Sequence, residues 1–217
     1  MKILSAELVT SASTAGPRAG LLRDDLPQFS FAGRSNVGKS SLLNALMRQR
    51  LARTSAAAGK TRQANIYRVT VGDAPGGPGR WSVYLVDLPG YGYARGGDKA
   101  VEEMRAVVDA YFAAAHGSTA AHDPATARRR GANFLLVDSR HPGLPSDLQA
   151  YHWISESAVV PVVVATKIDT LSRSERARNL RELERIYGRP PVPVSAAKGE
   201  GLDVLWHLIS ATARGEA

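Results

Sequence analysis

The sequence of 217 residues predicts a three-layer α/β fold, in which helices cover both faces of a mostly parallel sheet. Segments of strand and helix character alternate along most of the chain and are joined by short loops. Several predicted strands are apolar throughout, as at 132–137, which indicates strands buried on both faces. The glycine-rich and polar motifs each follow a predicted strand directly, where open α/β sheets bind their ligands.

The expected elements follow from the hydrophobic pattern along the chain. Strands are predicted at 2–10, 28–32, 64–71, 81–86, 132–137, 159–165 and 192–194. The strands 64–71 and 81–86 are joined by a Gly- and Pro-containing turn at 73–79, so one antiparallel pair is expected at the sheet edge. We expect residues 1–20 to form a strand and loop packed on a single domain of residues 21–213.

Helices are predicted at 41–47, from Asp98, from Pro145, after Ser172 and towards the C-terminus. Ser172 and Glu175 fit a capping box at the start of the fourth of these helices. The last two helices are expected to bury the apolar residues Ala177, Leu180, Leu183 and Ile186, and Leu202, Leu205 and Leu208, respectively.

The composition limits the class of protein. The chain has no cysteine, which excludes disulfides and cysteine-ligated metals. No apolar stretch is long enough to span a bilayer and no signal-peptide pattern is present, so we expect a cytoplasmic protein without membrane contact. Lysine and arginine outnumber aspartate and glutamate by 28 to 20, for a net charge of +8. This excess favours a polyanionic partner such as RNA, although a basic surface without such a partner is the alternative.

Residues 33–40 fit the phosphate-binding pattern G-x-x-x-x-G-K-[ST], between a predicted strand and a predicted helix. In such a loop the backbone N–H groups and the helix N-terminus face a polyphosphate. Lys39 supplies a positive charge, and the Ser40 hydroxyl can bind Mg²⁺. The alternative is a glycine-containing turn without a ligand. The expected nucleotide contacts here are Gly33, Arg34, Ser35, Asn36, Val37, Gly38, Lys39, Ser40 and Ser41.

Two further segments have the features of nucleotide-dependent switches. Asp87-Leu88-Pro89-Gly90 is a D-x-x-G pattern directly after the strand 81–86. In this position Asp87 would hold Mg²⁺ through water, and the Gly90 N–H would meet the terminal phosphate. The second segment, Gly59-Lys60-Thr61, resembles the end of another phosphate loop but lacks its first glycine. Thr61 is a candidate Mg²⁺ ligand and phosphate sensor, and the alternative is a solvated surface threonine.

Thr166-Lys167-Ile168-Asp169 indicates recognition of guanine. The Asp169 carboxylate can accept two hydrogen bonds from guanine, whereas adenine offers no such pair, and a site with an unpaired carboxylate would reject adenine. Lys167 can lay its stem along the base. Backbone amides after the strand 192–194 can meet the guanine oxygen, and the expected contacts there are Val194, Ser195, Ala196 and Ala197. This pattern argues against a P-loop kinase.

These motifs together resemble the EngB (YihA/YsxC) family of bacterial GTP-binding proteins, within the translation-factor-related GTPases. The resemblance rests on Gly-Arg-Ser-Asn-Val-Gly-Lys-Ser-Ser, Gly-Lys-Thr-Arg-Gln and Asp-Leu-Pro-Gly-Tyr-Gly-Tyr-Ala, and it runs from about residue 5 to 212. It implies the P-loop GTPase (G-domain) fold, guanine nucleotide with Mg²⁺, and a role in assembly of the large (50S) ribosomal subunit and in normal cell division or septation. Three departures from the family are Ala58, in place of the usual proline, and longer segments at 73–79 and 116–130.

The expected reaction is slow hydrolysis of GTP, with Lys39, Thr61 and Gly90 as the catalytic contacts. Tyr91 stands where Ras-like enzymes have a water-orienting glutamine, and a phenol cannot present the same paired donor and acceptor. We therefore expect a switch whose hydrolysis a partner accelerates. Asn36 is a candidate ligand for K⁺, which can supply transition-state charge in related GTPases; the alternative is that Asn36 only bonds within the loop.

The expected partner is the large ribosomal subunit, with its RNA and proteins, bound by a monomer whose moving parts lie at 50–63 and 88–97. The arginines at 128–130 either contact RNA phosphates or form a solvated charge run. The alternative function is a GTPase that regulates a protein partner without contacting RNA.

Overall fold

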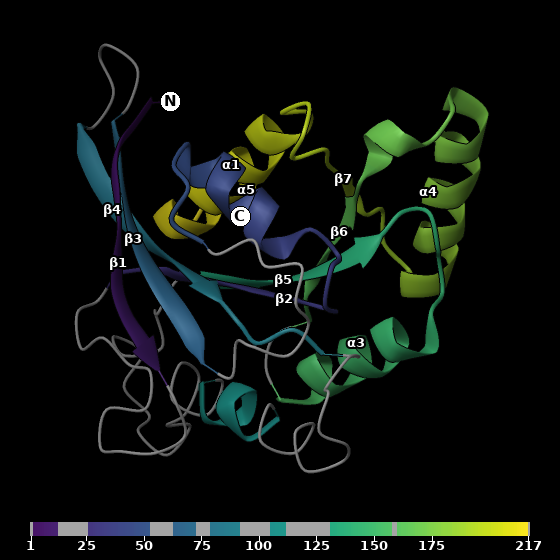
Figure 1. The fold of residues 1–217 in the computed structure, drawn as a ribbon, viewed down its shortest axis with the longest axis horizontal. Coiled ribbons are helices and arrows are strands. Elements are labelled where there is room, and N and C mark those ends of the chain that lie inside the picture. The colour runs from purple at the N-terminus through teal and green to yellow at the C-terminus, as the bar shows by residue number, and fades with distance from the viewer. Residues whose placement is uncertain are drawn as a thin grey trace.

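The computed structural model describes residues 2–12, 26–52, 63–72, 79–91, 105–111, 131–157 and 160–216. They form one seven-stranded sheet with the order β1-β3-β4-β2-β5-β6-β7 (Figure 1). The strands are β1 (Lys2–Ala12), β2 (Gln28–Gly33), β3 (Ala64–Gly72), β4 (Arg80–Asp87), β5 (Gly131–Asp138), β6 (Val162–Thr166) and β7 (Val192–Pro193). The helices are α1 (Lys39–Met47), α3 (Pro145–Ser157), α4 (Arg173–Tyr187) and α5 (Leu202–Arg214), with a 3₁₀ turn η1 (Ile168–Thr170). Residues 105–111 are also helical.

The predicted mostly parallel sheet is confirmed. β2 pairs in parallel with β4 and β5, and β6 continues the parallel set between β5 and β7. The antiparallel pairs are β1 with β3 and β3 with β4, at one edge. β1 is longer than predicted, and β6 begins three residues later than predicted, after Pro161, which has no N–H to donate to a ladder.

The three predicted layers are present (Figure 1). α1 and α5 cover one face of the sheet, and α3, α4 and the helical segment 105–111 pack on the other. Side chains alternate along β5: Phe134 and Leu136 pack with the α1 and α5 residues, whereas Leu135 and Val137 pack with those of α3. The central strands are therefore buried on both sides, which explains their continuous apolar sequence.

The predicted start of α4 is confirmed, but part of its predicted buried face is wrong. The Ser172 side chain accepts a hydrogen bond from the Glu175 N–H, and the Glu175 side chain accepts one from the Ser172 N–H. Leu183 is buried and Leu180 and Ile186 are partly buried, as predicted, whereas Ala177 is exposed. Asn179 and Tyr187 are buried instead, because the buried face follows the four-residue spacing through Leu183.

In α5, Leu205 is buried and Leu202 is partly buried, as predicted. Trp206 and Ile209 are the other buried residues of this helix, while Leu208 is only partly buried. The Trp206 indole N–H donates to the carbonyl of Leu46 in α1 at 3.3 Å, which fixes the two helices to each other. Within the described ranges, no helix is both long enough and apolar enough to cross a membrane.

Candidate functional site

Residues 33–40 form a tight loop from the end of β2 to the start of α1. Gly38 adopts the left-handed backbone conformation with φ 105°, which favours glycine, and precedes the first helical residue, Lys39. A Cβ atom on Gly33 would lie 2.8 Å from Cγ1 of Val37, so a side chain at position 33 would collide with the buried residue at the centre of the loop. The loop therefore has the backbone that its sequence predicts.

The structure brings Lys39 and Asp87 together. The Lys39 ammonium donates to the Asp87 carboxylate at the end of β4, and both side chains are largely buried. Ser40 lies next to Lys39 in the first turn of α1. Hydroxyl and carboxylate oxygens are hard donors that suit Mg²⁺. The described residues contain no group of three acidic or histidine side chains, so a Mg²⁺ ion here would take its other ligands from water and phosphate, as this ion commonly does.

The segment after Asp87 lies against the phosphate loop. The Leu88 N–H donates to the Phe31 carbonyl at 3.1 Å, and the Tyr91 N–H donates to the Gly33 carbonyl at 3.3 Å. The Ser35 N–H in turn donates to the Tyr91 carbonyl at 2.9 Å. A Cβ atom on Gly90 would lie 3.3 Å from the Ser35 nitrogen, so only a residue without a side chain fits this close approach comfortably. The D-x-x-G segment and the phosphate loop thus form one continuous backbone surface.

The Tyr91 side chain points into the core. The residue is 8% exposed, and its hydroxyl donates to Asp147 Oδ1 at 3.1 Å. Burial, reinforced by the nearby Asp147 carboxylate, raises the pKa of Tyr91 well above its usual range. The hydroxyl therefore stays protonated and donates its hydrogen bond to Asp147 of α3.

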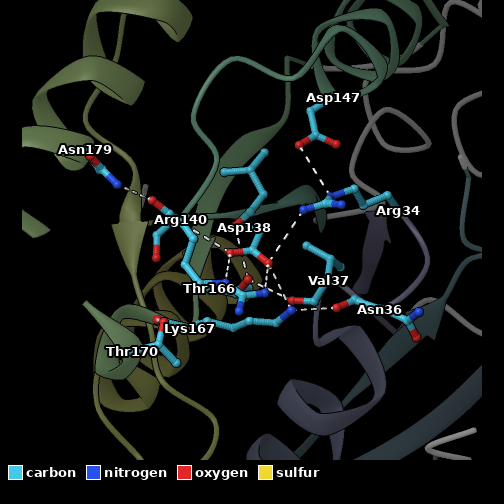
Figure 2. Close-up of polar contacts among 12 residues, drawn as sticks. Arg34, Asn36, Val37, Asp138, Arg140, Asp147, Thr166, Lys167, Thr170 and Asn179 are labelled. Carbon is cyan, nitrogen blue, oxygen red and sulfur yellow. Dashed lines mark hydrogen bonds and ion pairs between the residues drawn. The ribbon is translucent and has the colours of Figure 1, made fainter. Parts of the chain in front are cut away.

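Most of the predicted guanine-binding residues line one cavity. Thr166 Oγ1 lies 2.8 Å from the Val37 carbonyl, which joins the end of β6 to the phosphate loop. Lys167 has a left-handed backbone with φ 60°, and its ammonium donates to the Asn36 carbonyl at 2.7 Å (Figure 2). The cavity has a volume of about 170 Å³ and is lined by Gly38, Ser41, Leu42, Thr166, Lys167, Asp169, Thr170, Val194, Ala196 and Ala197.

The loop after β7 is closed by its own hydrogen bonds. The Ser195 N–H donates to the Glu200 carbonyl at 2.9 Å, and the Glu200 N–H donates back at 3.1 Å. Ser195 is fully buried, and its Oγ accepts from the Lys198 N–H at 3.1 Å. Ile168 is buried as well, and neither of these two predicted contacts lines the cavity, whereas Ala196 and Ala197 do.

Sequence reasoning missed the residue at the centre of this site, Asp138. Its carboxylate is 1% exposed at the end of β5 and lies 2.8 Å from Arg140 Nη2, 2.9 Å from Lys167 Nζ and 3.5 Å from Arg34 Nη2 (Figure 2). Burial alone would raise the pKa of Asp138, but the hydrogen bonds from Arg140 and Lys167 outweigh it and hold the pKa well below its usual range. The carboxylate is therefore a fixed negative charge.

A second buried carboxylate, Asp147 of α3, extends this network. Arg34 Nε lies 4.0 Å from Asp147 Oδ2, so Arg34 connects Asp147 with Asp138. Burial raises the pKa of Asp147, and the Tyr91 hydrogen bond and the Arg34 charge oppose that rise without cancelling it.

One signal in the sequence could have pointed to Asp138: like Asp87, it is an aspartate directly after an apolar strand.

Several predicted site residues lie outside the described part of the chain. These are Gly59, Lys60 and Thr61, together with Ala58, the segment 92–97 and the arginines at 128–130. Asn36 is described: its side chain is exposed and its backbone is left-handed with φ 65°, a conformation that asparagine tolerates better than most residues.

We predict that Asp138→Asn lowers the free energy of unfolding by about 3 kcal/mol at pH 7, because it removes a buried carboxylate from three cations. The Arg140→Gln variant is the matched control. It should cost about 1 kcal/mol or less, since the Arg140 side chain is 41% exposed. Urea unfolding measures both variants. Equal losses for the two variants would contradict the central position of Asp138.

We predict that Asp147→Asn removes a pH dependence of stability. The pKa of Asp147 is raised in the folded state, so its contribution is complete below the unfolded pKa and is lost as the pH rises through the folded pKa. The free energy of unfolding of wild type should therefore fall relative to that of Asp147→Asn as the pH rises above the usual aspartate pKa of about 4. The asparagine oxygen can still accept the Tyr91 hydrogen bond. Exposed Asp203→Asn serves as the control, and a pH-independent difference between wild type and Asp147→Asn would refute the prediction.

Known proteins agree with the fold and the motifs. Residues 28–194 match the family described as 50S ribosome-binding GTPase. The chain is similar to the probable GTP-binding protein EngB of Alkaliphilus oremlandii, with 35% identity over 96% of this chain and 91% of the relative. It is also similar to the probable EngB of Pelotomaculum thermopropionicum, with 39% identity over 96% of each chain.

A solved structure shares the fold. The crystal structure of Era in complex with MgGDPNP and nucleotides of 16S ribosomal RNA aligns with a TM-score of 0.63 and 23% identity. The alignment covers 84% of this chain and 55% of that protein, so it shows a likeness of fold alone. The chain belongs to the EngB family of GTP-binding proteins, within the 50S ribosome-binding GTPases.

Proposed function

We propose that the chain is a GTP-dependent switch that binds GTP or GDP with Mg²⁺, hydrolyses GTP slowly and acts in assembly of the large ribosomal subunit. The observation that carries this proposal is the position of the phosphate loop. It lies in direct contact with both the D-x-x-G segment and the cavity lined by Asp169. A nucleotide whose phosphates meet the loop would thus have its base at the cavity and its terminal phosphate at Gly90.

The phosphate side uses charge and backbone amides. The amides of residues 33–41 cradle the phosphates, with the α1 dipole behind them. Lys39 would exchange its Asp87 partner for phosphate oxygens, which leaves Asp87 available to a metal-bound water. Ser40 and Thr61 would complete the Mg²⁺ site, and the ion when bound neutralises charge on the phosphates. The Gly90 N–H then contacts the terminal phosphate.

The base side selects guanine through Asp169. This side chain is exposed at the cavity and is free to accept two hydrogen bonds from the base. Lys167 is held from behind by the Asn36 carbonyl and by Asp138, so its stem has a fixed position along the cavity wall. Backbone amides at Ala196 and Ala197 can meet the guanine oxygen.

Slow intrinsic hydrolysis is supported by the position of Tyr91. Its hydroxyl is bound to Asp147 inside the core, so it does not take the place of a water-orienting glutamine. A partner that supplies the missing positioning would accelerate the reaction. Asn36 remains our candidate K⁺ ligand. Its left-handed backbone, which asparagine tolerates well, would also explain by itself why an asparagine stands at this position.

We predict a low single-turnover rate of GTP hydrolysis for the isolated protein, and a higher rate in KCl than in NaCl at equal ionic strength. The rate in KCl should fall in the Asn36→Gly variant, because the side-chain ligand is lost while glycine readily adopts the left-handed backbone at this position. Rapid-quench measurements give these rates. Equal rates in the two salts would exclude the K⁺ site, and a fast rate for the isolated protein would exclude the slow switch.

The ribosomal role is supported by the family and by the basic composition of the chain. We expect the protein to act in the cytoplasm as a monomer and to be needed for normal cell division. An alternative is regulation of a protein partner without RNA contact, which the same nucleotide site would serve.

We predict that the protein sediments with isolated large ribosomal subunits, and that the bound fraction differs between GTP and GDP. The physical reason is that the D-x-x-G segment contacts the phosphate loop directly, so the terminal phosphate can change the surface that faces a partner. Isolated small subunits are the control. Failure to bind large subunits in either nucleotide state would favour the regulatory alternative.

A further inference from the structure

The outer face of α4 carries a row of arginines. Residues 172–189 contain six arginines and three glutamates. Three of these arginines, Arg178, Arg181 and Arg185, are spaced three and four residues apart, so their side chains share one face of the helix. All three are exposed, and the opposite face of the helix packs into the core beside α3. We call Arg178, Arg181 and Arg185 the α4 arginine row.

Neighbouring carboxylates neutralise only part of this row. Arg185 pairs with Glu182, with Nη2 and Oε1 2.7 Å apart, but its side chain remains 74% exposed. Glu175 is held at the start of the helix by its hydrogen bonds to Ser172. Within the part of the chain that the structure describes, neither Arg178 nor Arg181 forms an ion pair. The row thus presents net positive charge to solvent.

α4 is fixed to the nucleotide site at its first turns. Arg176 Nη1 lies 2.6 Å from Glu200 Oε1, in the loop that borders the guanine cavity. Asn179 Nδ2 donates to the Ser139 carbonyl at 2.9 Å, next to Asp138 (Figure 2). The arginine row therefore lies on a helix whose inner side is held by the same residues that shape the base-binding region.

The surface chemistry of α4 favours a nucleic acid over a protein. Protein interfaces are usually anchored by aromatic and apolar side chains. The large exposed hydrophobic residues among those described lie outside α4, at Leu4, Leu8, Val9, Val160 and Val204. Interfaces with nucleic acids are instead polar and positively charged, and arginine binds phosphate through its planar, multiple donors.

We propose that the α4 arginine row binds the phosphate backbone of ribosomal RNA. The row rises about 10 Å along the helix, so its three side chains can reach separate phosphates. This inference rests on the proposed function in ribosome assembly and names the surface by which the protein would contact the subunit.

The first test compares two triple variants with the same change in net charge. Arg178→Gln, Arg181→Gln and Arg185→Gln remove the row. The control variant carries Lys2→Gln, Arg68→Gln and Arg80→Gln, three exposed basic residues on β1, β3 and β4, near the edge of the sheet opposite β6 and β7 (Figure 1). Affinity for large subunits and for protein-free 23S RNA is measured over a range of KCl concentrations, and GDP binding by each variant reports an intact nucleotide site.

The affinity falls as salt increases, and loss of the row should make this fall less steep. The magnitude of the slope of log affinity against log salt concentration should decrease by about 2, because each phosphate contact contributes about 0.7–0.9. The control should retain nearly the wild-type slope on both ligands. Equal slopes for the two triple variants on subunits would overturn the inference. A loss confined to intact subunits, with unchanged binding to the RNA, would assign the row to an acidic ribosomal protein and would also overturn it. Absence of wild-type binding to subunits would instead refute the proposed function.

The second test uses a gain of affinity. Glu182→Gln releases Arg185 from its ion pair and should strengthen binding about two- to fivefold, the value of an exposed ion pair. Glu156→Gln removes the same charge from an exposed residue of α3, outside the row. An equal gain from both variants would show a general charge effect and would contradict a role for the row.

Discussion

One buried carboxylate joins the parts of the site that come from different strands. Asp138 ends β5, between β2 and β6, and accepts contacts from the phosphate loop, from its own loop and from the residue after β6. Three cations around a single carboxylate would repel one another without it. Lys167 donates to both the Asp138 carboxylate and the Asn36 carbonyl, so the positions of Lys167 and of the Asn36 carbonyl depend on the Asp138 charge. Asp138 itself lies outside the predicted nucleotide-binding motifs.

The parallel register of the sheet supplies the other constraint. β4, β2, β5 and β6 all end at the same edge, so Asp87, the phosphate loop, Asp138 and Lys167 follow neighbouring strands. The alternating side chains of these strands form two separate cores, one beneath α1 and α5 and one against α3 and α4. The C-terminal ends of these strands are therefore packed on both faces of the sheet, and the site consists of short loops that extend from this rigid core.

The features that depend on local sequence were predictable, and those that depend on distant partners were not. The layer order, the parallel strands and most of the residues lining the cavity follow from periodicity and from motifs of a few residues. The partner of the Tyr91 hydroxyl is 56 residues away, so nothing near Tyr91 indicates it. The error over Ala177 has the same origin: the buried face of α4 runs through Asn179, whose amide bonds the carbonyl of Ser139, a contact that hydrophobic spacing does not detect.

The hydrogen bonds of Tyr91 restrain the D-x-x-G segment. Gly90 is bonded to a residue that holds the phosphate loop with its backbone and α3 with its hydroxyl. A shift of Gly90 large enough to carry Tyr91 with it would break a buried hydrogen bond, at a cost of about 1–3 kcal/mol. The segment can therefore respond to a ligand in two ways, by small movements that keep this bond or by a discrete change that breaks it. Because the hydrogen bond is either kept or broken, the segment would favour two distinct positions over a continuous range of positions.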